Sequence, residues 1–179
     1  TVSGTPTLTL SNGDTASYAS GSGSTGIVFS TTVASGDTDS SDLAVSSIQP
    51  TAGGATMKDA AGNSIATTIA SGDLGSVSVD GNVPSFTSVA ATDGAYGVGE
   101  TLTITVTWGE AVVVSGTPTL ALSNGDTATY ASGTDSVALV FTTVIAQGDS
   151  TSADLSVSSF SGTITDAAGN AAAAASGDL

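Results

Sequence analysis

Hydrophobic and polar residues alternate strictly through the stretch TLTITVTW, residues 101–108. In an extended chain, successive side chains point to opposite sides, so this period of two is typical of a half-buried β-strand. The side predicted to face a core consists of Leu102, Ile104, Val106 and Trp108. We expect the four threonines that alternate with them, Thr101, Thr103, Thr105 and Thr107, to face away from the core.

Shorter apolar segments, each bounded by Gly, Ser or Asp, predict further strands around residues 26–33, 42–48, 137–145 and 154–160. Asn12-Gly13 and Asn124-Gly125 have the residue types of a tight type I′ hairpin turn. The alanine-rich end, residues 170–179, is predicted as a strand, with a helical turn as the alternative because alanine favours helices. About seven short strands in roughly 95 residues predict an immunoglobulin-like antiparallel β-sandwich.

The sequence contains the same unit twice. SGTPTLTLSNGDTASYASG at residues 3–21 returns almost unchanged at residues 115–133, an offset of 112. The offset falls to 107 for the DAAGN motif and to 105 for ASGDL, as expected when loops change length while strands stay paired. A copied unit of this length favours a structural role over a single catalytic site.

The repeat predicts two domains, each of which lacks one or more strands at an edge of its sheet. Residues 1–82 form a repeat that lacks its first strands, and residues 83–179 form a repeat that lacks its last strand. The stretch VDGNVP, residues 79–84, is predicted to join them. We therefore expect tandem immunoglobulin-like sandwiches, the first incomplete at its N-terminal edge. Either the chain belongs to a longer array of repeats, or neighbouring chains donate the missing strands.

Composition and charge exclude several classes of partner. Sixteen acidic residues and the single basic residue Lys58 give a formal charge of −15, which would repel the phosphates of nucleic acids. No stretch has the roughly 18 consecutive apolar residues that a membrane-spanning helix needs. We expect neither nucleic-acid binding nor membrane insertion.

The residues needed for most kinds of catalysis are also missing. The chain has no His, Cys or Arg, so it has no imidazole base, thiolate nucleophile or guanidinium group. A carboxylate pair could use only Glu100 and Glu110 as glutamates, and Lys58 is replaced by Thr165 in the second copy. We therefore predict that the protein is not an enzyme.

The acidic residues are better suited to Ca²⁺, which prefers carboxylate and amide oxygens gathered on loops. Asp93 and Glu110 lie near the predicted joint, where a bound ion would stiffen a string of domains. The alternative is that these Asp and Asn residues cap turns through their own hydrogen bonds. The predicted ligands are Asp37, Asp39, Asp42, Asp59, Asn63, Asp80, Asp166 and Asn170.

Several motifs of residues 83–179 together resemble the bacterial immunoglobulin-like repeats of large cell-surface proteins and biofilm adhesins. Most of residues 1–82 resembles the same repeat. The matching residues are Asp93-Gly94 with Tyr96, Gly99-Glu100, Glu110-Ala111-Val112, Gly116-Thr117-Pro118-Thr119-Leu120 and Asp166-Ala167-Ala168-Gly169-Asn170. The resemblance implies an exported, Ca²⁺-assisted extender module on the bacterial cell surface.

The function expected from the repeat and from the resemblance is a stalk, filament or surface-layer building block. Its partners would be neighbouring repeats or identical chains, joined by strand donation. The alternative is a β-sandwich module that binds a glycan or ice, using the threonine face of residues 101–107 or the aromatic residues Tyr18, Trp108 and Tyr130. For Trp108 the alternation itself predicts a place in the core.

Overall fold

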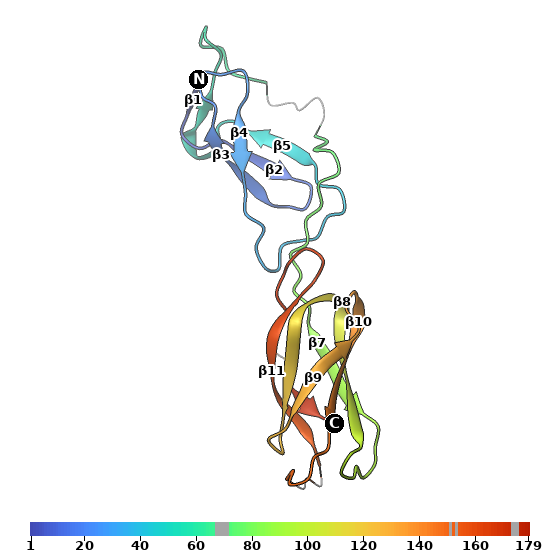
Figure 1. Cartoon of the computed structure of the whole chain (residues 1–179). Helices are drawn as coiled ribbons and strands as arrows, with labels where there is room; N and C mark the ends of the chain where they lie inside the picture. Colours follow the sequence, from blue (N-terminus) through green and yellow to red (C-terminus); the bar gives the residue numbers. More distant parts are fainter. Residues whose placement is uncertain (67–71, 151, 153, 173–175) are drawn as a thin grey trace. The chain divides into compact units, whose positions relative to one another are not determined.

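The structure is a computed structural model that describes residues 1–66, 72–150, 152, 154–172 and 176–179. Its described residues form antiparallel β-sheets with no α-helix, which confirms the all-β prediction (Figure 1). None of them forms a helix long and apolar enough to cross a membrane. Internal contacts divide the chain into two compact units, Thr1–Asn82 (unit 1) and Val83–Leu179 (unit 2), and each is described by itself.

Unit 2 is organised around one long strand, β8 (Thr101–Leu122). The first part of β8 pairs with β7 and β10, and the second part pairs with β9 and β11 (Figure 1). Because β10 also pairs with β9, the sheet bends back on itself around a single core. The other strands are β7 (Phe86–Ala91), β9 (Thr127–Ser132), β10 (Ser136–Val144), β11 (Ser156–Thr165) and β12 (Gly177–Asp178).

The alternating segment 101–108 lies in this core as predicted. Leu102, Ile104, Val106 and Trp108 are at most 3% exposed, whereas none of the four threonines that alternate with them is buried. Trp108 packs edge-to-face on Phe86, with ring centroids 6.4 Å apart. The prediction that Trp108 belongs to the core is confirmed.

Unit 1 repeats part of this arrangement with shorter strands. Its main sheet has the order β4-β3-β2-β5, in which β2 (Thr7–Leu10), β3 (Thr15–Ser20) and β5 (Val45–Gln49) correspond to the end of β8, to β9 and to β11. The remaining elements are β4 (Val28–Ser30), β1 (Val2–Ser3) paired with β6 (Thr56–Met57), and a short 3-10 turn at Ala52–Gly54.

The two cores differ in size because β10 of unit 2 has a paired strand on each side, whereas among the described residues its counterpart β4 in unit 1 has one on only one side. In unit 2, Leu139 and Phe141 of β10 are fully buried between neighbouring strands. In unit 1, β4 is an edge strand of the described sheet, so Phe29 is only partly buried and Val28 is 52% exposed. The described core of unit 2 has twelve buried residues in its cluster, and the main cluster of unit 1 has four.

The hairpins at Asn12-Gly13 and Asn124-Gly125 are not type I′ turns, so this prediction was wrong. A type I′ turn needs positive φ at both central residues, but only the glycines, with φ of 100° and 98°, have it. The amide N–H of Gly13 donates to Leu10 O and that of Leu10 donates to Asp14 O, at 3.1 and 2.8 Å. These bonds belong to a longer loop in which a type I turn is followed by a left-handed glycine.

The alanine-rich end of the chain is extended where the structure describes it. Ala171 forms an antiparallel bridge with Thr165, and Gly177–Asp178 forms strand β12 against β11. Residues 173–175 lie outside the described part, as do residues 67–71 of the equivalent segment in unit 1. The described residues therefore support the strand interpretation over the helical turn.

Candidate metal centre

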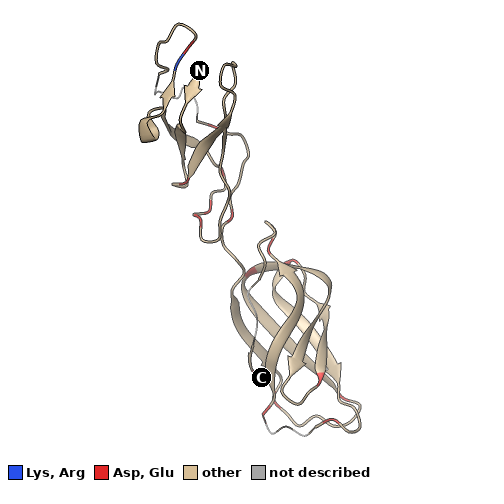
Figure 2. Ribbon diagram, turned by 90° about the vertical axis from the view of Figure 1, so that its left-hand side faces the viewer, with Lys and Arg blue, Asp and Glu red and all other residues tan. Residues whose placement is uncertain are grey.

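Most acidic residues lie in loops and turns, where a cation could be enclosed (Figure 2). All acidic residues except Glu110 and Asp178 lie outside the strands. Within unit 2, two of them come together. An oxygen atom of the Glu110 carboxylate and one of the Asp166 carboxylate lie within 4.8 Å of each other.

Strand pairing explains why these two residues meet although they are 56 positions apart. Thr165, the last residue of β11, pairs with Val113 of β8 in antiparallel register. Asp166, which directly follows β11, therefore lies beside the segment that contains Val112 and Glu110. Residues 110 and 112 share one side of an extended strand, and Val112 is fully buried, so Glu110 points toward the same inner side.

Asp166 is held in a turn that orients its carboxylate. The backbone N–H groups of Gly169 and Asn170 donate to Oδ1 at 2.7 and 2.8 Å, and the Asn170 side-chain amide donates to Oδ2 at 2.8 Å. Asp166 is only 3% exposed. Its burial alone would raise the pKa of this carboxyl, but the hydrogen bonds from Asn170, Gly169 and Ala168 outweigh burial and hold the pKa below its ordinary value.

Two carboxylates at this separation repel each other when both are ionised. At an effective dielectric constant of about 20, the repulsion is on the order of 3 kcal/mol. The hydrogen bonds favour the ionised form of Asp166, and a cation bound between the two carboxylates would offset their repulsion. Hard divalent cations such as Ca²⁺ and Mg²⁺ accept carboxylate oxygens as ligands, so the pair can form part of a metal centre.

The equivalent turn of unit 1 is closed by a similar set of hydrogen bonds in an exposed setting. Asp59 Oδ1 accepts the backbone N–H groups of Ala61 and Asn63, and its Oδ2 accepts the Asn63 side-chain amide, all at 2.9 Å. The Asn63 side chain is the main reason why the pKa of Asp59 is lowered. In both units this Asp–Asn pair forms an Asx turn cap, which is the alternative that the sequence left open.

The structure does not bring Asp37, Asp39 and Asp42 together, although the sequence placed them in one predicted site. Asp37 Oδ2 accepts the backbone N–H of Ala34 at 2.6 Å, so this side chain caps its own loop. The three carboxylates, all described, do not have oxygen atoms that all lie within 4.8 Å of one another.

Within unit 1, Asp39 and Asp80 both hold the segment that ends at Asn82. The backbone N–H of Gly81 donates to Asp39 Oδ1 at 2.9 Å, and the Asn82 side-chain amide donates to Asp39 Oδ2. Asp80 Oδ1 accepts the Asn82 backbone N–H at 3.1 Å. Whether Asp80 binds a metal ion stays a prediction from the sequence.

Comparison with known proteins finds no match: no family model matches the sequence, and neither a curated protein nor a solved structure does. The candidate centre therefore depends on the chain's own geometry. Glu110 was not among the metal ligands predicted from the sequence. The sequence placed Glu110 near the joint, but its distance from Asp166 depends on how β8 and β11 pair.

Proposed function

We propose that this chain consists of immunoglobulin-like β-sandwich repeats of an extracellular bacterial surface protein and serves as an extender or stalk. The observation that supports the proposal most is that the two copies share individual side-chain hydrogen bonds as well as their sequence. The backbone N–H of Ser22 donates to the Tyr18 hydroxyl in unit 1, and that of Thr134 donates to the Tyr130 hydroxyl in unit 2, both at 2.9 Å. A scaffold repeated to this detail suits a protein that needs length.

We also propose Ca²⁺ as the ion of the Glu110–Asp166 centre. Ca²⁺ takes six to eight oxygen ligands in flexible geometry, and extracellular modules bind it with dissociation constants of about 10⁻⁴ to 10⁻³ M. Ion binding to the end of β11 would hold that strand against β8. This contribution would stiffen the unit under tension.

Thermal unfolding with and without Ca²⁺ tests the metal assignment. At a hundredfold excess over the dissociation constant, one bound ion stabilises the folded state by about 2.7 kcal/mol, which is several degrees or more in Tm for a domain of this size. We expect Glu110→Gln and Asp166→Asn to abolish this Ca²⁺-dependent rise. Asp59→Asn is the matched control, because it alters the equivalent turn of unit 1, and it should keep the rise.

The readout is the difference in Tm between Ca²⁺ and chelator for each variant, so a loss of turn capping does not affect the comparison. An equal Tm in Ca²⁺ and chelator for the unmodified chain would contradict the metal centre and leave Asp166 as a turn cap. Asp80→Asn in the same assay tests the ligand that was predicted from the sequence alone.

Pulling on both ends of the chain by force spectroscopy tests the extender function. Unit 2 has 97 residues, so its unfolding should lengthen the chain by about 30 nm in one step. Extension without a resolved step would contradict a role in transmitting tension. Saturable binding of a glycan or ice, lost on replacing the exposed Thr101 and Thr103, would instead support the alternative function.

A further inference from the structure

The two units differ in what lies beside the loop that precedes β5 or β11. In unit 1, the chain continues from Leu74 and runs antiparallel to this loop. Leu43 N–H donates to Val77 O at 2.7 Å, and Ser40 and Val79 exchange two backbone hydrogen bonds at 2.8 and 2.9 Å. The next contact, from Gly36 N–H to Gly81 O, measures 2.8 Å. We call residues 75–81 the covering segment.

The covering segment completes the core of unit 1. Leu43 is 6% exposed and Val79 is 8% exposed, and both belong to one cluster with Leu10 and Ala16. Val77 is 41% exposed, so Val79 is the side chain that enters the core. The segment thus adds one apolar side chain and satisfies the backbone groups of the loop.

In unit 2, the corresponding loop positions are uncovered. At the offset of 112, Gly36, Ser40 and Leu43 correspond to Gly148, Ser152 and Leu155. No described residue accepts a hydrogen bond from the backbone N–H of any of these three unit 2 residues. Leu155 is partly exposed, whereas its counterpart Leu43 is buried.

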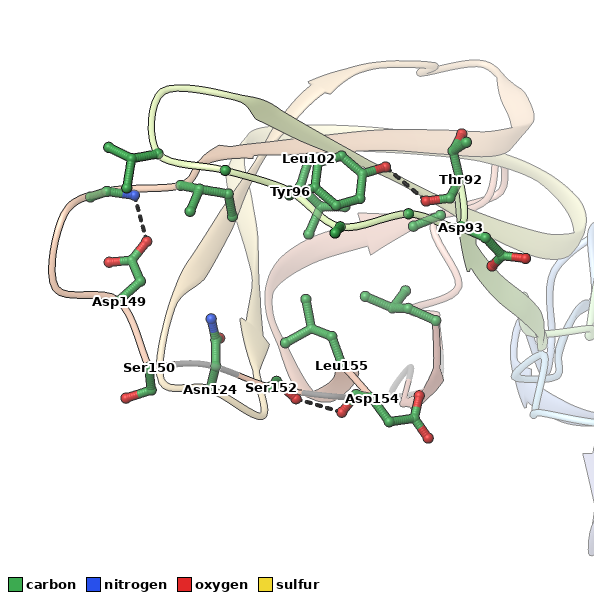
Figure 3. Close-up of a pocket in the computed structure, with 18 of the residues that line it drawn as sticks. Thr92, Asp93, Tyr96, Leu102, Asn124, Asp149, Ser150, Ser152, Asp154 and Leu155 are labelled. Carbon is green, nitrogen blue, oxygen red and sulfur yellow. Dashed lines mark hydrogen bonds between the residues drawn. The ribbon is translucent and has the colours of Figure 1, made fainter.

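A cavity of about 610 Å³ in unit 2 is lined by these same loop residues, Gly148, Ser152 and Leu155 (Figure 3). Leu102, Ile145, Leu155 and Leu179 supply apolar surface to the cavity, and Ser152 and Asp154 lie along one side. The cavity therefore combines a cluster of apolar side chains with polar groups and with the backbone donors of the loop. This is the combination that an added β-strand requires.

We propose that this cavity is the acceptor site for a β-strand with the pattern of the covering segment, Gly-Ser-Val-Ser-Val-Asp-Gly, from a further polypeptide segment. The strand's first valine carbonyl accepts from Leu155 N–H, and its second valine pairs with Ser152 and enters the cavity. Its final glycine carbonyl accepts from Gly148 N–H. The sequence pattern of the strand is taken from unit 1, where the equivalent loop forms these hydrogen bonds with the covering segment.

The inference does not depend on the extender function, because a strand can complete the sheet of a protein with any function. It also does not depend on the metal centre, which involves other residues. Failure of the experiment below would therefore leave the proposed function untouched. Conversely, strand binding without a Ca²⁺ effect would reject only the metal centre.

The test adds the eight residues Gly-Ser-Val-Ser-Val-Asp-Gly-Asn after Leu179, because the same eight residues follow Leu74. Amide hydrogen exchange is measured at Leu155 in the original and extended chains. We expect the extension to slow Leu155 exchange at least tenfold. In the matched control, the second valine of the extension is replaced by Asp. Its charge is unfavourable beside Leu155 and the acidic residues that line the cavity, so exchange should remain fast.

Two substitutions separate the acceptor site from a general change in stability. In the extended chain, Leu155→Ala should restore fast exchange at residue 155, whereas Leu43→Ala in unit 1 should leave the protection intact. Trp108 fluorescence confirms that unit 2 of each variant remains folded. Unchanged Leu155 exchange in the extended chain, or equal protection by the Asp-containing extension, would overturn the proposal.

Discussion

Phe29 and Phe141 occupy equivalent positions in the two copies, and their different burial predicts different costs of truncation. Phe141 is fully buried and packs on Tyr130 and Phe160, with ring centroids 5.9 and 6.5 Å away. Phe29 contacts Tyr18 at 6.3 Å but remains partly exposed. We expect Phe141→Ala to destabilise unit 2 much more than Phe29→Ala destabilises unit 1.

The magnitude follows from the cavity left behind. Truncating a fully buried Phe to Ala costs about 3 to 5 kcal/mol, and a partly exposed Phe costs less because it loses less buried surface. With a urea m-value of about 1.5 kcal/mol/M, Phe141→Ala should lower the midpoint by roughly 2 to 3 M. This loss is a large part of the 5–15 kcal/mol typical of a domain.

The assay uses Trp108, the only tryptophan of the chain, as a reporter of unit 2. Urea titration followed by Trp108 fluorescence should show the lowered midpoint for Phe141→Ala. Phe29→Ala should leave the Trp108 midpoint unchanged and reduce only the circular-dichroism signal assigned to unit 1. A Trp108 midpoint within 0.3 M, or about 0.5 kcal/mol, of the original for Phe141→Ala would refute the reasoning.

Three further predictions concern single side chains of unit 2. Asp166 has a lowered pKa, so its contribution is fully present above the unfolded-state pKa of about 4 and is lost as pH falls through the folded pKa. The difference in urea midpoint between the original chain and Asp166→Asn should therefore shrink below about pH 4, and a constant difference down to pH 2.5 would contradict this. Gly162 has a φ of 129°, and a Cβ there would lie 2.5 Å from Pro118 Cβ, so Gly162→Ala should lower Tm in calorimetry by more than the exposed Gly125→Ala at positive φ. Trp108 Nε1 is buried without a hydrogen-bond partner among the described residues, a cost of about 1–3 kcal/mol. Trp108→Phe removes this donor and keeps an aromatic ring in the core, so it should lower the calorimetric Tm far less than Trp108→Ala, which also leaves a cavity; equal losses would contradict the core packing of Trp108.

Local pattern was enough to predict the strand at residues 101–108 and the side of it that is buried. Alternation reports which side chains share one face of an extended chain, and this property does not depend on the partner strand. The turn at Asp166–Asn170 could also be predicted from the sequence. The Asp166 side chain accepts hydrogen bonds from Gly169 and Asn170, which are only three and four residues further along the chain. The internal repeat predicted that unit 1 would have the same turn.

The tertiary structure decided everything that depends on pairing between distant segments. Equivalent phenylalanines are buried to different degrees because β10 has strands on both sides and β4 lies at an edge of its described sheet. Glu110 approaches Asp166 only through the register of β8 and β11, which no spacing in the sequence reveals. The hairpin loops likewise adopted one left-handed glycine instead of two left-handed residues, because the adjoining strands set how many residues the loop must span. Sequence periodicity constrains a strand's own faces, whereas neighbours, registers and shared sites arise only when separate strands are brought together.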